Sequence, residues 1–305
     1  MNIGILGLSG RSLFFSCGHF HAEGETLTAD AFWQEPGGKG YNQAVAARRL
    51  GAQVTYLTCL GQDAAGRQCR DVLEREGVCC LAQTTALPTA CACILTDPEG
   101  RNRVTVYPGA AARLNEAFLA RHAEQLAACQ LFLLNLECPL PVVNAAIQLA
   151  ERLRIPVILN PAPALALPLK TLRRLFLLTP NQQEAHALLR LRGEVPPAQL
   201  ARCFFAHGFA QVVVTLGSRG ALVARQGHAW LYPCLPVRPV DTTGAGDCFS
   251  AALAVALGQG QSLEQAAVFA VNAAAYSVAR PHVLAGLPTL AALEPLHPVE
   301  PVCLF

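Results

Sequence analysis

The chain has 305 residues and is 52% hydrophobic, which is enough to bury one large core. Its formal net charge is +2 and its basic residues are scattered, which argues against nucleic acid as a partner and favours a small substrate. No uncharged apolar run reaches the roughly 18 residues of a membrane helix. The apolar first ten residues lack the basic start of a signal peptide. We expect one compact unit without membrane contact.

Thirteen cysteines are spread over apolar segments, and none forms a CxxC pair. The closest group, Cys79, Cys80, Cys91 and Cys93, matches no familiar spacing of zinc ligands. The pattern therefore favours reduced cysteines over a disulfide framework, and with them a cytoplasmic location.

Apolar runs of strand length alternate with helical patterns, which is typical of a parallel α/β sheet. The runs cover residues 54–60, 131–136, 157–159, 175–178 and 212–216. Polar motifs follow them, with Glu137, Asn160, Asn181 and Glu184 after three of the runs and a loop that begins at Gly217 after the last. Ligands of such sheets bind outside the carboxyl ends of the strands, so these residues are expected to converge on one site.

Two stretches interrupt the alternation. Residues 89–97 and 101–107 flank Asp97-Pro98-Glu99-Gly100, a turn signal that predicts a β-hairpin. Residues 13–35 also have a β-like composition without a helical period.

Near the end of the chain, Asp241-Thr242-Thr243-Gly244-Ala245-Gly246-Asp247 precedes a helical run of small residues that Gly258 closes. The first N–H groups of a helix are unpaired and its dipole is positive there, so this turn favours an anion. Asp247 falls in the first turn, where it can accept a proton from a hydroxyl that attacks a phosphate. The pattern alone also fits an ordinary glycine-rich turn. Farther on, Ser262 and Gln265 form a capping box that opens a long helix.

Five motifs cover nearly the whole chain in a fixed order. They are Gly37-Gly38-Lys39-Gly40-Tyr41-Asn42-Gln43-Ala44-Val45-Ala46, Asn160-Pro161-Ala162-Pro163-Ala164, Thr179-Pro180-Asn181-Gln182-Gln183-Glu184, Thr215-Leu216-Gly217-Ser218-Arg219-Gly220 and the run 241–247. In these motifs the chain resembles the ribokinase-like carbohydrate kinases of the PfkB family. The resemblance implies a three-layer α/β/α sandwich with a mainly parallel sheet. It further implies a core of residues 1–12, 37–88 and 110–305, and a β lid of residues 13–36 and 89–109 that forms a homodimer contact.

The resemblance also implies an ATP-dependent, magnesium-requiring kinase that phosphorylates a primary hydroxyl of a small sugar. Asp247 is then the general base, and the N–H groups of Gly244, Ala245 and Gly246 hold the transferring phosphoryl group. The sugar contacts that it implies are Ser12, Gly38, Lys39, Asn42, Glu137 and Asp247. The nucleotide contacts that it implies are Asn181, Thr215, Gly217, Ser218, Gly220, Gly246 and Asn272. Glu184 is expected to hold magnesium through water, and Asp241 and Thr243 to hold a monovalent cation such as K⁺.

Several of these residues have an ordinary alternative. Lys39 fits a solvated lysine beside a helix start, and Glu137 fits a helix cap or a surface charge. Asn181 and Glu184 fit an N-cap pair, a role that is compatible with magnesium binding.

Two segments depart from the family pattern. Gly10-Arg11-Ser12 stands where relatives carry Asn-x-Asp, whose aspartate binds two sugar hydroxyls, so the acceptor need not be ribose. Arg280-Pro281-His282-Val283 stands where relatives carry a basic-Gly-Ala stretch, which leaves potassium activation open.

Other readings remain. A nucleoside, a ketose or an acidic sugar is an alternative acceptor. A non-catalytic sugar or nucleotide sensor is disfavoured because a sensor needs no base at Asp247. A nicotinamide-dependent dehydrogenase is disfavoured because residues 4–10 do not have the GxGxxG spacing.

Overall fold

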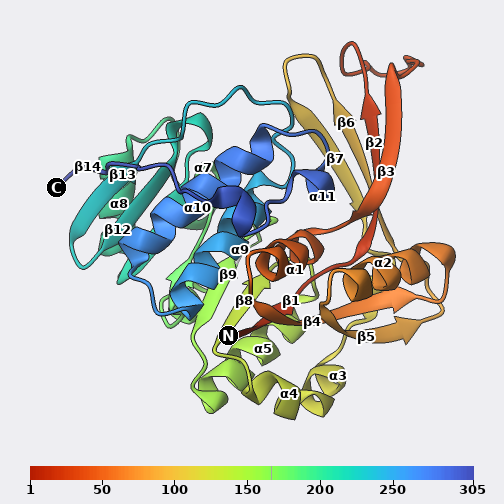
Figure 1. The fold of residues 1–305 in the computed structure, drawn as a ribbon, viewed down its shortest axis with the longest axis horizontal. Helices are drawn as coiled ribbons and strands as arrows, with labels where there is room; N and C mark the ends of the chain where they lie inside the picture. Colours follow the sequence, from red (N-terminus) through yellow and green to blue (C-terminus); the bar gives the residue numbers. More distant parts are fainter. Residues whose placement is uncertain (166) are drawn as a thin grey trace.

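The computed structural model describes residues 1–165 and 167–305. A six-stranded parallel sheet lies at its centre, in the order β10-β9-β8-β1-β4-β5 (Figure 1). Its strands are β1 (Asn2–Leu6), β4 (Gln53–Gly61), β5 (Cys79–Thr85), β8 (Leu131–Asn135), β9 (Val157–Asn160) and β10 (Leu177–Leu178). Helical connections join most of them, as parallel pairing requires.

Helices cover both faces of this sheet and make two hydrophobic cores. Side chains alternate along β1, so Ile5 belongs to one core and Leu6 to the other. The first core lies under α1 (Lys39–Arg49), α2 (Ala64–Arg75), α9 (Ala245–Gly258) and α10 (Leu263–Val278). The second lies under α3 (Glu116–Arg121), α4 (Ala123–Ala127), α5 (Leu140–Leu153), α6 (Leu169–Leu172), α7 (Gln182–Leu189) and α8 (Pro197–Ala206). The capping box of Ser262 and Gln265 opens α10 as predicted.

A second sheet continues the first one at β10. It is antiparallel and consists of β11 (Gln211–Thr215), β12 (Ala221–Arg225), β13 (His228–Tyr232) and β14 (Val302–Cys303). A parallel bridge between Asn181 and Thr215 connects the two sheets. The run 212–216 was expected in the parallel sheet, but the turn that follows it is too short for a crossover, so β12 returns antiparallel.

A third sheet projects from the core (Figure 1). Its strands, in the order β3-β2-β6-β7, are β2 (Gly10–Ser16), β3 (Ala31–Gly37), β6 (Ala90–Thr96) and β7 (Asn102–Tyr107). The hairpin expected on either side of residues 97–100 is β6–β7. Strand β2 starts at Gly10, before the expected lid boundary at residue 13, so Ser12 is part of this sheet. We call these four strands the lid sheet.

Short helical segments complete the fold: α11 (Val283–Gly286) and the 3-10 turns Gly109–Arg113, Gly217–Arg219 and Ala291–Leu293. No helix in the described part of the chain combines the length and apolar character that crossing a membrane requires.

Candidate active site

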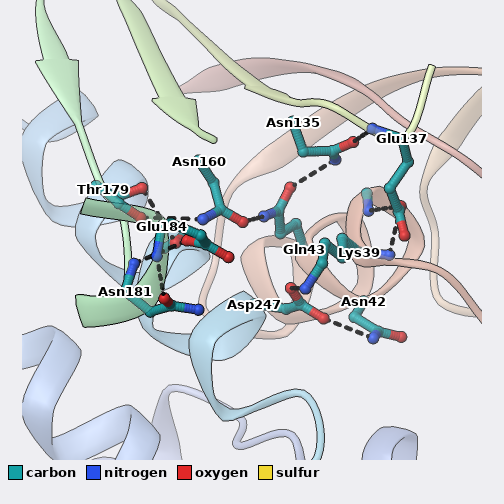
Figure 2. A network of polar contacts seen from close by, with 12 residues as sticks. Lys39, Asn42, Gln43, Asn135, Glu137, Asn160, Thr179, Asn181, Glu184 and Asp247 are labelled. Atoms are coloured by element: carbon teal, nitrogen blue, oxygen red, sulfur yellow. Dashed lines mark hydrogen bonds and ion pairs between the residues drawn. The ribbon is translucent and has the colours of Figure 1, made fainter. Parts of the chain in front are cut away.

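Polar side chains from distant parts of the sequence converge at one edge of the central sheet (Figure 2). Helices α1 and α9 both begin there, and strands β8 and β9 end there. This arrangement places the motif at residues 37–46 beside the motif at residues 241–247. The convergence follows from parallel strand order, because the carboxyl ends of such strands share one edge.

The turn before α1 requires glycine at position 38. Gly38 is the N-cap residue of α1 with φ of 116°, a conformation that side chains with a Cβ rarely adopt. A Cβ there would also meet the carbonyl oxygen of Leu8. The close approach of two backbone segments places Lys39 at the first position of the helix, facing the site.

Asp247 is buried at the start of α9 and held from two sides. Asn42 Nδ2 donates a hydrogen bond of 2.8 Å to its Oδ2, and Lys39 Nζ lies 3.9 Å from its Oδ1. Burial raises the pKa of Asp247, while Lys39 and the bond from Asn42 lower it. Asp247 in turn is the main cause that raises the pKa of Lys39. The two groups therefore stabilise each other as an ion pair, and Lys39 is not merely a solvated lysine.

Asn42 also presents a free acceptor. Its Oδ1 is buried and has no hydrogen-bond partner within the described residues. A Cβ on Gly37 would lie 2.5 Å from Ser12 Oγ and 4.0 Å from Asn42 Oδ1, so Ser12 and Asn42 border the same space. An unpaired buried oxygen is costly, and a ligand hydroxyl would satisfy it.

Glu137 holds the beginning of α1. Its Oε2 accepts hydrogen bonds from the backbone N–H of Lys39 (2.7 Å) and Gly40 (3.4 Å). Burial raises the pKa of Glu137 to about 7, while Lys39 acts in the opposite direction. The geometry thus corresponds to the helix-cap alternative, through which Glu137 positions Lys39. Direct sugar binding by Glu137 stays a prediction.

A chain of buried amides connects α1 to the strands. Asn135 Nδ2 donates to Gln43 Oε1 (3.2 Å), and Gln43 Nε2 donates to Asn160 Oδ1 (3.3 Å). Asn160 Nδ2 then donates to the carbonyl of Thr179 (3.0 Å) (Figure 2). Gln43 and Asn135 were not singled out from the sequence. Two features of the sequence could have indicated them: Gln43 is an amide just after the Gly37–Lys39 turn, and Asn135 is an amide at the last residue of a buried strand.

Glu184 and Asn181 form the expected N-terminal cap of α7. Each side chain accepts a 2.8 Å hydrogen bond from the other residue's backbone N–H. Glu184 is buried, which raises its pKa, and its charge interacts with those of Lys39 and Asp247. No group of three His, Cys, Asp or Glu side chains gathers for a metal in the described parts of the chain. A single carboxylate fits magnesium, which keeps most of its water, but not a metal that needs a full protein cage.

The turn at residues 241–246 opens α9. Gly244 is its N-cap residue with φ of 76°, and a Cβ there would lie 2.5 Å from Val283 Cγ1. Asp241 Oδ1 accepts the backbone N–H of Thr243 at 2.9 Å, which shapes the turn. Gly246 is exposed with open space beside it. The turn thus presents the start of a 14-residue helix to an open edge.

The candidate nucleotide residues fall into two groups. Gly217 and Ser218 are exposed between β11 and β12, after Thr215, and Gly217 has open space beside it. Gly220 instead packs against the carbonyl of Tyr232 and shapes the loop. Asn272 is buried, and its amide pairs with the backbone of Val268 and His297. Because these polar atoms are already paired within the chain, we leave Asn272 out of the proposed nucleotide site.

Arg11 lies on the face of β2 opposite to Ser12, as strand alternation requires. It lines a cavity of about 280 Å³ with Asp63 and Thr89, at the start of α2. Its Nε is buried and has no partner among the described residues. Arg11 therefore lies away from the space that Ser12 and Asn42 border.

Comparison with known proteins identifies the class. Residues 12–290 match the family of pfkB carbohydrate kinases, and the chain belongs to that family. It is 34% identical to a ribokinase of Haemophilus influenzae, over 93% of this chain and 94% of the relative. It is 35% identical to a ribokinase of Bacillus subtilis, over 97% and 99% of the two chains.

Solved structures agree with this assignment. A ribokinase of Thermotoga maritima superposes with a TM-score of 0.84 at 33% identity, covering 96% of this chain and 97% of the other. A ribokinase of Arabidopsis thaliana, complexed with ribose and ATP, superposes with a TM-score of 0.85 at 27% identity, covering 95% and 96%. The predicted ribokinase-like fold and the predicted enzyme class, a carbohydrate kinase acting on an alcohol group, are confirmed.

Proposed function

We propose that this carbohydrate kinase transfers the γ-phosphoryl group of ATP to a primary hydroxyl of a small sugar, with Asp247 as the general base. The observation that carries the proposal is the buried carboxylate of Asp247, held by Asn42 and Lys39 at the start of α9. The relative from Arabidopsis thaliana, complexed with ribose and ATP, supports a small sugar and ATP as the two classes of substrate. The particular sugar stays open, with a ketose, a nucleoside and an acidic sugar as alternatives.

In the proposed reaction, the free Oδ1 of Asn42 receives a sugar hydroxyl. The primary hydroxyl lies against Asp247, which accepts its proton as the oxygen attacks the γ-phosphorus. The N–H groups of Gly244, Ala245 and Gly246 receive negative charge on the transferring phosphoryl oxygens. Lys39 and Asn42 favour the ionised form of Asp247 against the effect of burial, which raises its pKa.

The donor side is assigned to the exposed loop after β11 and to α7. Gly217 and Ser218 border the nucleotide, and Glu184 holds magnesium through water while it caps α7. Magnesium neutralises phosphate charge when bound. Asp241 and Thr243 are the candidates for a monovalent cation; Asp241 already uses one carboxylate oxygen within its own turn.

The lid sheet is the proposed homodimer contact. Large apolar side chains are exposed on it: Phe32 (55%), Val104 (52%), Val106 (47%) and Tyr107 (53%). The strand register puts Val104 and Val106 on the face that carries Ser12 and Phe14, and Phe32 and Tyr107 on the opposite face. Each face of the lid sheet therefore offers exposed apolar side chains to a second copy. Light scattering should give twice the mass of the 32.4 kDa chain, whereas a monomer would refute the contact. The thirteen free cysteines fit the proposed cytoplasmic location.

A substrate panel tests the proposal. Pentoses, hexoses, sugar acids and nucleosides are incubated with Mg-ATP, and ADP release is measured for each. The proposal predicts sugar-dependent release with at least one small carbohydrate. Release with nucleosides alone would favour the nucleoside alternative. ATP binding without turnover on any compound would favour a sensor.

The Ser12→Asp substitution addresses the acceptor. The family resemblance implies an aspartate there that binds two sugar hydroxyls. A charged hydrogen bond contributes roughly 1.5–3 kcal/mol, or about 10- to 150-fold in affinity. Ribose should therefore be a poor substrate of the wild type, and the variant should raise kcat/KM for ribose. Glu35 lies directly across from Ser12, and repulsion between like charges places the expected gain at the lower end.

Steady-state kinetics on ribose give the answer, with Ser16→Asp as the matched control. Ser16 lies on the same strand and the same face, at its other end. Ordinary wild-type turnover of ribose that Ser12→Asp leaves unchanged would show that another residue binds those hydroxyls.

A further inference from the structure

Glu35 is a carboxylate of the lid sheet that the proposed function leaves unassigned. It lies on β3, with its side chain partly buried. Its Oε1 accepts the backbone N–H of Val283 (3.0 Å), and its Oε2 accepts that of Leu284 (3.1 Å). Both donors belong to the first turn of α11, at the other end of the chain. Charge-assisted bonds of this kind are stronger than neutral ones, so Glu35 ties the lid sheet to the core.

Apolar contacts reinforce the tie. Val283 is buried in one cluster with Phe14 and Ile94, which lie on the same face of the lid sheet as Ser12. The ring of His282 meets Trp33 edge-on at 5.2 Å, and Trp33 stacks on Phe14 at 4.9 Å. The segment 282–284 is therefore docked on the lid sheet by polar and apolar contacts together.

The other side of Val283 faces the turn that opens α9. The position of a Cβ on Gly244 lies 2.5 Å from Val283 Cγ1, so the valine packs directly against this turn. Arg49 of α1 holds the carbonyls of Leu284 and Leu287. Glu35 thus accepts hydrogen bonds from N–H groups of this segment, and Arg49 donates to its carbonyls. The two side chains hold the same short segment from both ends of its peptide groups.

We propose that Glu35 is a positioning residue for phosphoryl transfer, which fixes Val283 against Gly244 so that the lid sheet sets the shape of the phosphate-binding turn. This rests on the proposed function, which assigns the turn to the transferring phosphoryl group. The arrangement couples the two substrates: a sugar under the lid sheet orders the turn for the nucleotide, and the nucleotide tightens the sugar site by the same factor.

Calorimetry on the Glu35→Ala variant tests the coupling. The Kd of ADP is measured with and without the sugar that the panel identifies. In the wild type the sugar should tighten ADP binding by about 5- to 150-fold. In Glu35→Ala this factor should fall to near one, with the Kd of ADP alone unchanged. Loss of both hydrogen bonds should lower kcat by about 10- to 100-fold. Hydrogen exchange at the amides of Val283 and Leu284 should become faster.

Three further variants separate coupling from folding. Glu35→Gln keeps one acceptor oxygen, so its coupling factor should lie between those of the wild type and Glu35→Ala. Glu99→Gln removes a charge from the exposed tip of the same sheet and should match the wild type. Val283→Ala keeps both hydrogen bonds but removes the contact with Gly244, and should lose the coupling as Glu35→Ala does. The double variant of Glu35→Ala and Val283→Ala should lose no more coupling and no more kcat than either single variant, because both act on the same contact.

Wild-type coupling and kcat in Glu35→Ala would overturn the role of Glu35 and leave the kinase function standing. The role of Glu35 would also be overturned if the losses in kcat of Glu35→Ala and Val283→Ala multiply in the double variant, because the two residues would then act independently. If Glu35→Ala fails to fold, the same ratio of ADP affinities with and without the sugar is measured in Glu35→Gln and Val283→Ala. Wild-type ratios in both variants would overturn the role of Glu35. A wild type without turnover on any sugar would refute the proposed function and this inference together.

Discussion

The Asp247→Asn variant should lose between about 10²- and 10⁴-fold in kcat, because the amide keeps the shape of the carboxylate but cannot accept the hydroxyl proton. The bond from Asn42 can persist, since the new side chain retains one oxygen that faces Nδ2. Nucleotide affinity should therefore change little, whereas thermal stability should fall because Lys39 loses its ion-pair partner. Steady-state kinetics with ATP and the sugar, together with ADP binding, measure both effects.

Asp71→Asn is the matched control, because it makes the same change on the exposed surface of α2. It should retain wild-type kinetics. Near-normal turnover in Asp247→Asn would exclude Asp247 as the base. Since burial raises the pKa of Asp247, the acid limb of the wild-type pH–rate profile should lie above the usual range of an aspartate. The rate should fall as the pH decreases through that pKa, because the base is then protonated.

Removal of divalent metal should abolish turnover. The phosphoryl groups carry several negative charges, and Lys39 is already paired with Asp247. We therefore expect magnesium to be required to neutralise the phosphate charge of the donor. Activity should vanish in excess EDTA and return with added Mg²⁺. Turnover that persists without metal would contradict the magnesium assignment.

Glu184→Ala should raise the magnesium concentration needed for half-maximal activity far more than it changes the KM of the sugar. The variant also removes half of the capping box, which typically costs about 0.5–2 kcal/mol of stability. Ser262→Ala removes half of the equivalent capping box of α10, outside the named site residues, and serves as the control for the loss of a cap. An equal magnesium requirement in both variants would assign Glu184 to the cap alone.

The sequence predicted the central features of the fold well, because they depend on local patterns. The buried strands around residues 54–60, 131–136 and 157–159 are continuous apolar runs, and the structure has β4, β8 and β9 there. The capping box of Ser262 was equally local. The sheet membership of β11 was not predicted, because it depends on the short turn at Gly217 and on pairing with β12.

Pairwise contacts in the site were harder to predict from the sequence. The approach of Asn42 to Asp247 spans the whole chain and requires the fold itself. Glu35 gave no signal, since an isolated glutamate in a β-like segment is usually a surface charge. Its partners are backbone N–H groups about 250 residues away, which no side-chain motif reports.

Rapid-quench single turnover of wild type and Asp247→Asn, with ATP and the sugar both bound, measures the central claim most directly. The reaction is stopped at defined times, and the sugar phosphate is identified by mass spectrometry and ³¹P NMR. The account predicts one phosphate on the primary hydroxyl for each ADP formed, with the bond-forming step in the variant slower by at least about 10²-fold. An equal rate of phosphoryl transfer in the two proteins, or ADP formed without a sugar phosphate, would contradict it.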